Sequence, residues 1–428
     1  MDDVVLLSEV FGISRDVPLN YVARNKVDGV FVDSLTRSKH IVVHGGSKQG
    51  KTCLRKWNLE ATEYILVTCS NTWGLAALHA AILKQAGYVV EQSSTLTVRG
   101  SHKITAKVGG RMGIGLFGAS GEAAGEASKE STTASTTIQL ELDPGDVNDI
   151  IHALTGLPDP KWRYVVLEDF HYLPETTQRE FAVALKAFHE SSPLTFIVVG
   201  VWRDKNRLIQ HNGDLSGRVI SVDADLWSEP ELREVVELGE KKLNITFDAG
   251  FKEGLLRGCY DSVAVLQESC YLACQISGVT ATRDYAVFVD PDLSAPDVVR
   301  QVVENDAARY QSFLRNFSGG FMETELEMYK WLLLPVLDAS REQLERGLLY
   351  RDVGATIDAF HPAGELNRGN LTQALQSTAS LQVKKGITPI ILDYDQTSRR
   401  LHIVDRGFLI WLDLQNRNEL KRELALPC

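Results

Sequence analysis

Long apolar runs are missing from this sequence. No stretch approaches the ~20 consecutive apolar residues that a membrane-spanning helix needs. The first ten residues, MDDVVLLSEV, are acidic and lack the basic segment with which a signal peptide begins. We therefore expect a protein of the cytoplasm that makes no membrane contact.

Closely paired cysteines are also missing. The six cysteines, at positions 53, 69, 259, 270, 274 and 428, form no C-x-x-C pair. This argues against a disulfide scaffold or a structural zinc site and favours a reducing compartment. Cys270 and Cys274 lie four residues apart in an apolar, helix-like stretch, so we interpret them as buried thiols rather than zinc ligands.

Excess positive charge is the third absence. The net charge of −11 argues mildly against a protein that coats DNA non-specifically, because such proteins are normally basic. Any nucleic-acid contact must come from local patches. The 44% hydrophobic and 24% charged fractions are those of an ordinary globular protein, and 428 residues suffice for two or three domains.

The most informative stretch is His40–Thr52, HIVVHGGSKQGKT, in which an apolar strand leads into the spacing G-x-x-x-x-G-K-T. This is the P-loop signature, in which backbone N–H groups and a helix N-terminus hold nucleotide phosphates. Lys51 is expected to reach the β- and γ-phosphates of ATP, and the Thr52 hydroxyl to bind Mg²⁺. A glycine-rich turn without ligand is the alternative, but the preceding strand and the helix expected at Cys53–Leu59 favour the P-loop. The predicted nucleotide contacts are Gly45, Gly46, Ser47, Lys48, Gln49, Gly50, Lys51, Thr52 and Cys53.

Two acidic residues follow a second apolar strand, Tyr164–Leu167. P-loop enzymes need a carboxylate at a strand end to hold Mg²⁺ and to position the attacking water. By position, Glu168 is the magnesium-side group and Asp169 the water-side group. The alternative is a solvated strand end. The order is the reverse of the commoner Asp-Glu, and the shorter Asp169 predicts slow hydrolysis.

Two arginines follow the next elements. Arg203 comes after the strand Leu194–Gly200, at the edge where a doubly wound sheet binds ligands, and is a candidate γ-phosphate sensor. Arg218 lies in a later loop and is a candidate arginine finger, supplied in trans if subunits assemble. A plain structural arginine is the alternative for Arg218.

The segment 93–140 differs in character from its surroundings. It begins with alternating apolar and basic residues at 98–111 and continues into a glycine-rich and then Ser/Thr/Ala/Glu-rich run. We interpret it as an insertion, a β-hairpin with a mobile tip, that grips DNA, a neighbouring subunit or a partner. A flexible excursion without function is the alternative.

The rest of the chain predicts two further domains after a P-loop domain at 1–235. Helices expected at Glu229–Asn244, 249–277 and Val298–Phe313 make a helical lid at 236–317. Helices followed by a hairpin around a polar turn at 396–400 predict a winged-helix domain at 318–428. Its basic residues at 384–400 form a candidate DNA patch and are Lys384, Lys385, Arg399 and Arg400.

This order of parts resembles the AAA+/STAND superfamily of P-loop ATPases, near the origin-recognition initiators and the bacterial STAND switch proteins. The resemblance implies an α/β P-loop NTPase fold with a parallel sheet, followed by a helical lid and a winged helix. It also implies the roles given above for Lys51, Thr52, the Glu168–Asp169 pair, Arg203 and Arg218. Two departures, the inverted acidic pair and the lack of a second-sensor arginine near Cys259–Val263, argue for tight binding with slow turnover.

Two functions follow from these features. The first is an ATP-driven switch that forms a homo-oligomer or activates a protein effector, a role that in STAND-like proteins often serves antiphage defence. The second is a DNA-binding ATPase of the initiator or transposition-regulator kind, with contacts through 98–111 and 384–400. A GTP-binding protein is disfavoured because no NKxD-type segment is suitably placed.

Overall fold

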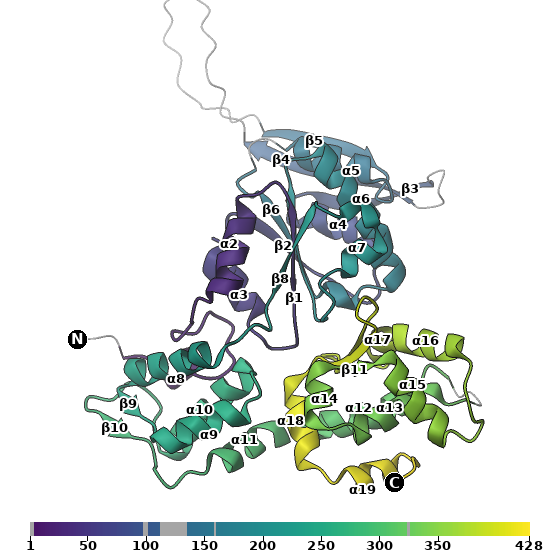
Figure 1. The fold of residues 1–428 in the computed structure, drawn as a ribbon. Helices are drawn as coiled ribbons and strands as arrows, with labels where there is room; N and C mark the ends of the chain where they lie inside the picture. The colour runs from purple at the N-terminus through teal and green to yellow at the C-terminus, as the bar shows by residue number, and fades with distance from the viewer. Residues whose placement is uncertain (1–3, 97–101, 112–134, 158–159, 323–325) are drawn as a thin grey trace, which may run out of the picture.

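A parallel sheet of five strands forms the centre of the N-terminal half in the computed structural model (Figure 1). The structure describes residues 4–96, 102–111, 135–157, 160–322 and 326–428. The strand order is β2-β6-β7-β1-β8, and every neighbouring pair is parallel. The strands are β1 (His40–His44), β2 (Tyr64–Thr68), β6 (Tyr164–Glu168), β7 (Thr195–Val199) and β8 (Val219–Asp223). The predicted α/β fold with a parallel sheet is confirmed.

Both faces of this sheet are buried, which explains its nearly continuous apolar strands. Alternate residues of one strand enter different cores: Ile41 and Val43 pack with α2 and α3, whereas Val42 packs with α4 to α6. Figure 1 shows α2 and α3 on one side of the sheet and α4 to α7 on the other. The helices are α2 (Val30–Leu35), α3 (Lys51–Asn58), α4 (Leu75–Gln85), α5 (Val147–Thr155), α6 (Glu175–Ser191) and α7 (Arg207–His211), with short turns η1 (Asn25–Gly29), η2 (Phe170–Tyr172) and η3 (Gly213–Leu215).

A small antiparallel sheet occupies the predicted insertion. Its strands are β3 (Val89–Leu96), β4 (His102–Arg111) and β5 (Ser135–Leu142), in the order β3-β4-β5. The strands pair antiparallel, and the expected mobile tip lies outside the described residues. Ile104 and Ala106 are buried against the core beneath, and the basic Lys107 pairs with Glu91 at 3.0 Å.

The second half begins with helices, as expected for the lid. They are α8 (Glu229–Leu243), α9 (Ala249–Gly258), α10 (Val263–Ile276), α11 (Ala295–Glu304) and α12 (Ala307–Ser318), joined by the N-terminal α1 (Leu7–Val10) and the strands β9 (Ile245–Thr246) and β10 (Val287–Phe288). The prediction of one helix over Val298–Phe313 is wrong, because the chain breaks at Asn305–Asp306. Cys270 and Cys274 are fully buried free thiols, as predicted.

The C-terminal elements run in the order helices, short strand, helices, hairpin. They are α13 (Met328–Asp338), α14 (Arg341–Arg346), β11 (Leu348–Leu349), α15 (Tyr350–Phe360), α16 (Arg368–Gln376), α17 (Thr378–Lys384), β12 (Leu392–Asp395), β13 (Arg400–Ile403), α18 (Arg406–Leu414) and α19 (Arg417–Glu423). The predicted hairpin is formed by β12 and β13, which pair antiparallel, and β11 completes a three-stranded sheet. This order is the one on which the winged-helix prediction rests.

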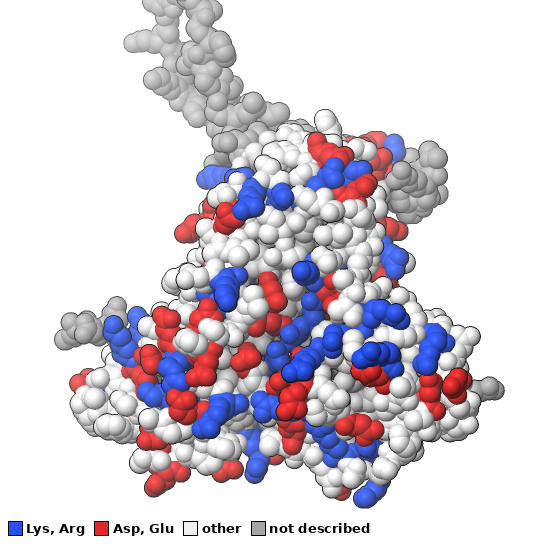
Figure 2. All heavy atoms as spheres, viewed as in Figure 1, with Lys and Arg blue, Asp and Glu red and all other residues white. Residues whose placement is uncertain are grey.

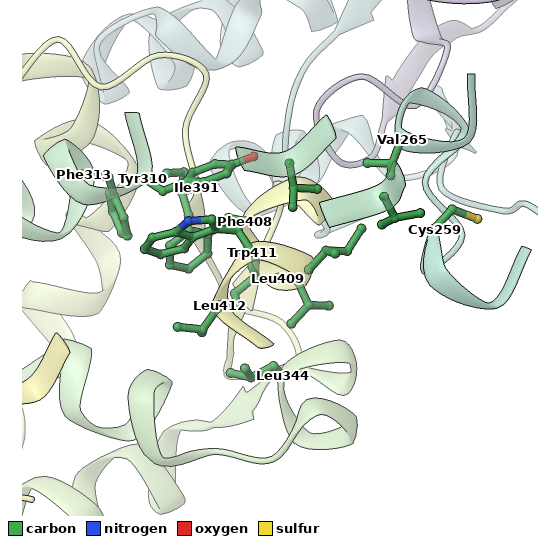
Figure 3. Packing of buried hydrophobic residues seen from close by; sticks show 14 of the residues in the cluster. Cys259, Val265, Tyr310, Phe313, Leu344, Ile391, Phe408, Leu409, Trp411 and Leu412 are labelled. Atoms are coloured by element: carbon green, nitrogen blue, oxygen red, sulfur yellow. The ribbon is translucent and has the colours of Figure 1, made fainter. Parts of the chain in front are cut away.

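One hydrophobic core joins the lid helices to the C-terminal elements. Figure 3 shows Phe408 and Trp411 of α18 beside Tyr310 and Phe313 of α12, with the Tyr310 ring centroid 5.4 Å from those of Phe408 and Trp411. This core also includes residues of α1 and α8 to α11. We call residues 25–225 the sheet body and residues 4–22 with 228–428 the helical body. A separate small cluster joins the two bodies and comprises Val201, Ala379, Val383, Ile390 and Val404, with Tyr172 against it.

Charges of both signs are interspersed over the face shown in Figure 2. The predicted basic residues at 384–400 have separate partners: Lys384 lies over the Phe321 ring, and Arg399 lies over the Tyr350 ring. None of the described helices has both the length and the hydropathy to cross a membrane. The domain boundaries stay predictions, and α8 runs without a break across 235/236.

Candidate functional site

The P-loop connects β1 to α3 at the carboxyl edge of the sheet. Gly45 and Gly50 have φ values of +139° and +83°, a region that side chains disfavour, so these two positions need glycine. The Gly45 N–H donates to the Trp202 carbonyl at 3.0 Å, and the Trp202 side chain is fully buried after β7. The loop therefore rests on the sheet and leads directly into the first turn of α3.

Lys51 lies among carboxylates. Its ammonium group donates to the carbonyls of Gly45, at 3.1 Å, and Gly46. Burial lowers the pKa of Lys51 to about 8, and the nearby carboxylates of Asp225 and Asp169 partly oppose this shift. The Lys51 ammonium group is desolvated and bonds only to carbonyls of its own loop, so it can exchange these partners for a phosphate.

The loop has unused hydrogen-bonding capacity that suits phosphates. The first N–H groups of a helix have no partner within the helix, and here they belong to α3. Gln49 is only 1% exposed, and both polar atoms of its amide lack a hydrogen-bond partner among the described residues. The exposed Thr52 is free to meet a metal at the phosphates. Within the described residues no three His, Cys, Asp or Glu side chains gather to hold a metal, so Mg²⁺ would need oxygens from the nucleotide itself.

The predicted magnesium ligand Glu168 has a partner that sequence reasoning missed. Arg55 of α3 is 2% exposed and donates to Glu168 Oε1 from Nη2 at 2.8 Å and from Nε at 3.0 Å. Arg55 also donates to the Tyr64 hydroxyl. The available signal was spacing, because Arg55 follows Lys51 by four residues and so lies on the same side of the helix. Glu168 Oε2 is the carboxylate oxygen left for a metal.

Asp169 is held in an unusual conformation directly after β6. Its φ of 57° and ψ of 30° are left-handed, which is uncommon for a residue with a side chain. Burial and the neighbouring Glu168 raise the pKa of Asp169, while Lys51 lowers it. The charges of Asp169 and Lys51 therefore influence each other, and the water-side role of Asp169 stays a prediction.

Arg203 reaches the P-loop indirectly. It forms an ion pair with Asp225, with Nε 3.1 Å from Oδ2, and Asp225 Oδ1 accepts the Gly46 N–H at 2.7 Å. Asp225 is 4% exposed and was not singled out from the sequence. Its signal was its place just after β8, the strand beside β1. The structure therefore joins Arg203 to the loop through a carboxylate.

Arg218 lies at the other edge of the sheet within the same chain. It immediately precedes β8, and its carbonyl accepts the N–H of His40, the first residue of β1. Its side chain pairs with Glu190 at 2.9 Å. The structure does not bring Arg218 together with the P-loop of its own chain, so only a role in trans is open to it.

The helical body closes over the P-loop. The Ser47 N–H donates to the Val404 carbonyl at 2.8 Å, and Lys48 Nζ lies 3.4 Å from an Asp306 oxygen. The cavity left between the bodies at this point has a volume of about 160 Å³. Of the P-loop residues, only Ser47 and Lys48 line this cavity.

No protein-family model matches this chain, and no curated protein matches it. Solved structures with a similar arrangement include a Walker-type ATPase of Pyrococcus abyssi, with a TM-score of 0.49, 12% identity and coverage of 92% of this chain and 99% of that one. The Orc1 protein of Aeropyrum pernix in complex with DNA has a TM-score of 0.42 and 10% identity, with coverage of 97% of this chain and 98% of that one. Cdc6p of Pyrobaculum aerophilum has a TM-score of 0.37 and 11% identity, with coverage of 98% of this chain and 99% of that one. At these values the similarity carries no conclusion about activity, which has to be inferred from the geometry of this chain.

Proposed function

We propose that this protein is an ATP-binding molecular switch that hydrolyses ATP slowly. The observation that carries the proposal is the position of Lys51 at the start of α3, where its desolvated ammonium group donates to the Gly45 and Gly46 carbonyls and is influenced by the carboxylates of Asp169 and Asp225. Lysine, helix N-terminus and strand-end carboxylates are the parts that phosphoryl transfer requires, because positioning and charge stabilisation supply most of its catalysis. The unpaired amide of Gln49 supports the same assignment.

In this proposal each group has one task. Lys51 and the N–H groups from Gln49 to Cys53 would hold the phosphates, while Thr52 and Glu168 would hold Mg²⁺, which would neutralise phosphate charge. Asp169 orients the attacking water and accepts its proton. Its short side chain favours slow turnover, whereas its raised pKa makes the carboxylate a better proton acceptor.

The switch itself is the movement of the helical body. In the closed arrangement the Val404 carbonyl accepts the N–H of Ser47, so the helical body competes with a phosphate for this part of the loop. ATP therefore binds the open arrangement better than the closed one, and a ligand shifts an equilibrium by its difference in affinity. We propose that ATP releases the helical body and exposes the surface that a partner or a second copy binds.

The test combines ATP binding with turnover. Lys51→Ala should lose ATP affinity, while Lys84→Ala, at an exposed lysine of α4, serves as the matched control. Glu168→Gln and Asp169→Asn should bind ATP and lose hydrolysis. Retained ATP affinity in Lys51→Ala would contradict the site, and unchanged turnover in both acid variants would remove the pair from the chemistry.

The oligomer is tested separately through Arg218. Its side chain is 32% exposed, and a role as a finger for a neighbouring subunit requires release from Glu190. Mass photometry with ATP and Mg²⁺ should show a defined oligomer, and Arg218→Ala should lower its ATPase rate without weakening ATP binding. A monomer at all ATP concentrations contradicts the finger.

The second candidate, a DNA-binding ATPase, draws on the exposed Lys385 at the end of α17 and the exposed Arg399 at the hairpin turn. Contacts of lysine and arginine to phosphates release counterions, so duplex affinity should fall steeply as salt rises from 50 to 200 mM, that is by about 10-fold or more for a few contacts. An affinity that does not change with salt, or no duplex binding at all, rejects this candidate.

A further inference from the structure

Arg406 of the helical body lies beside the P-loop. It is the first residue of α18, and it follows Val404 by only two residues. Because the Val404 carbonyl accepts the Ser47 N–H at 2.8 Å, this hydrogen bond fixes the start of α18 close to the loop. Arg406 also lines the small cavity at this place, together with Ser47 and Lys48.

The guanidinium group of Arg406 is partly buried and has no partner. Within the described part of the chain it makes neither an ion pair nor a hydrogen bond. Its Nε is enclosed, whereas the terminal nitrogens Nη1 and Nη2 are not, so a ligand in the cavity can reach them. A charge that has lost part of its water is normally paired, because leaving it unpaired costs free energy.

The three carboxylates that line this cavity already have partners. Asp306 and Asp405 pair with Arg309, at 3.4 and 2.6 Å. Glu268 accepts the Ile13 N–H at 2.7 Å. None of these carboxylates lies within ion-pair distance of the guanidinium group, so the cavity wall supplies no counter-charge to it.

A second arginine lies close to Arg406. Burial and the like charge of Arg203 lower the pKa of Arg406, while Asp225 opposes this shift. Both oxygens of Asp225 are already in use, because Oδ2 pairs with Arg203 and Oδ1 accepts the Gly46 N–H. Two guanidinium groups therefore share the neighbourhood of one engaged carboxylate, and an added anion would give the second group its missing partner.

A phosphate is the anion that suits this position. Its oxygens match the planar fork of a guanidinium group, and the adjacent loop is the one that would hold nucleotide phosphates. Arg203, the neighbour of Arg406, is the predicted γ-phosphate sensor, so Arg406 lies at the γ-phosphate end of the site. Resting on the proposed ATP function, we propose that Arg406 binds the γ-phosphate of ATP and makes the site prefer ATP to ADP.

This role gives ATP two effects on the helical body. The phosphate displaces the Val404 carbonyl from Ser47, which starts the movement. Arg406 then binds the phosphate through a long side chain that can follow it while the backbone of α18 moves away. The helical body is thereby held in a defined second position, which ADP, without a γ-phosphate, does not hold.

The experiment compares the affinities of ATP and ADP for the full chain with Mg²⁺, by calorimetry. Arg406→Gln should weaken ATP binding at least about 10-fold, because charge-assisted hydrogen bonds are lost, and should change ADP affinity less than about 3-fold. Arg406→Lys keeps the charge without the fork and should give an intermediate ATP affinity. Arg422→Gln, at an exposed arginine of α19, is the matched control and should change neither affinity. An equal loss for both nucleotides, or no loss for either, overturns the proposal.

The melting temperature separates phosphate binding from a structural role. Because Arg406 has no partner among the described residues and lies near Arg203, Arg406→Gln should leave the melting temperature of the nucleotide-free protein unchanged or higher. A lower melting temperature with an unchanged ratio of ATP to ADP affinity would assign Arg406 a structural role and contradict the proposal.

Lys51→Ala shows which of the two proposals fails. This variant should lose both nucleotides, and if it keeps them, the ATP site and the role of Arg406 are both rejected. If Lys51→Ala loses both nucleotides while Arg406→Gln keeps the wild-type preference for ATP, only the role of Arg406 is rejected.

Discussion

Gly46 offers a way to open the closed arrangement while leaving Lys51 and the N–H groups from Gln49 to Cys53 unchanged. A Cβ added there would lie 2.8 Å from the Val404 carbonyl oxygen and 3.1 Å from Asp225 Oδ1. The first contact is with backbone of the helical body, which cannot rotate away. Gly46 has no left-handed φ, and the P-loop spacing leaves this position free, so Gly46→Ala is compatible with the loop itself.

The expected size follows from the interactions that the substitution disrupts. Separating Val404 from the loop breaks the Ser47 hydrogen bond, worth about 1 kcal/mol, and relief of the overlap contributes about 1–3 kcal/mol. The closed arrangement of Gly46→Ala is thus destabilised by about 2–4 kcal/mol relative to the open one. Where the closed form dominates, apparent ATP affinity should rise by about 30-fold or more, up to the point at which the open form is the major species.

Titration with a fluorescent ATP analogue gives the affinity, and small-angle scattering gives the radius of gyration, which should increase in the variant. Gly74→Ala is the matched control, because a Cβ at Gly74 meets nothing within 4 Å. The double variant Arg207→Gln/Asp393→Asn removes an ion pair between the bodies away from the loop and should change affinity in the same direction. ATP affinity in Gly46→Ala equal to or below that of the wild type would refute the idea that Val404 competes with the nucleotide.

Three further outcomes are expected. Burial lowers the pKa of free Lys51 to about 8, and a bound phosphate favours its charged form, so ATP affinity should fall as pH rises through 8. Above pH 8 the protein should take up a proton when ATP binds, which calorimetry in two buffers measures. An affinity that does not change with pH contradicts this. Arg55→Met leaves the partly buried Glu168 unpaired and should lower the free energy of unfolding by about 2–4 kcal/mol in urea titrations; a change below about 0.5 kcal/mol would mean that the pair is unimportant. In Gly200→Ala the new Cβ would lie 1.6 Å from the Trp202 ring, so the free energy of unfolding should fall by about 3 kcal/mol or more, and a wild-type urea midpoint would show that Trp202 is free to move.

The parts of the fold that could be predicted are those set by local pattern. Strands buried on both faces are apolar runs, and the loop between β1 and α3 is fixed by glycines at defined spacing, so both could be predicted from residues 40–52 alone. The helix break at Asn305–Asp306 could not, since the apolar period continues across it. Residues at and after the break make long-range contacts: Lys48 lies near Asp306, and Arg309 pairs with Asp405 at 2.6 Å.

The residues of the candidate site could be predicted from the sequence, but the partner of each charged side chain could not. Position after a strand identified Glu168, Asp169 and Arg203, because strand ends meet at one edge of a parallel sheet. Which cation meets which carboxylate depends on side chains from distant elements, as with Arg55 and Asp225. No described feature bears on the antiphage role that the resemblance implies.

The arrangement of cores limits how the switch can work. The predicted lid and the C-terminal elements share one hydrophobic core, in which α18 packs against α12, so separating them would expose large aromatic side chains. The helical and sheet bodies meet through a far smaller apolar cluster, together with polar pairs such as Arg207–Asp393. Motion is therefore cheapest between the bodies, and a lid that closes while the C-terminal elements turn separately is disfavoured.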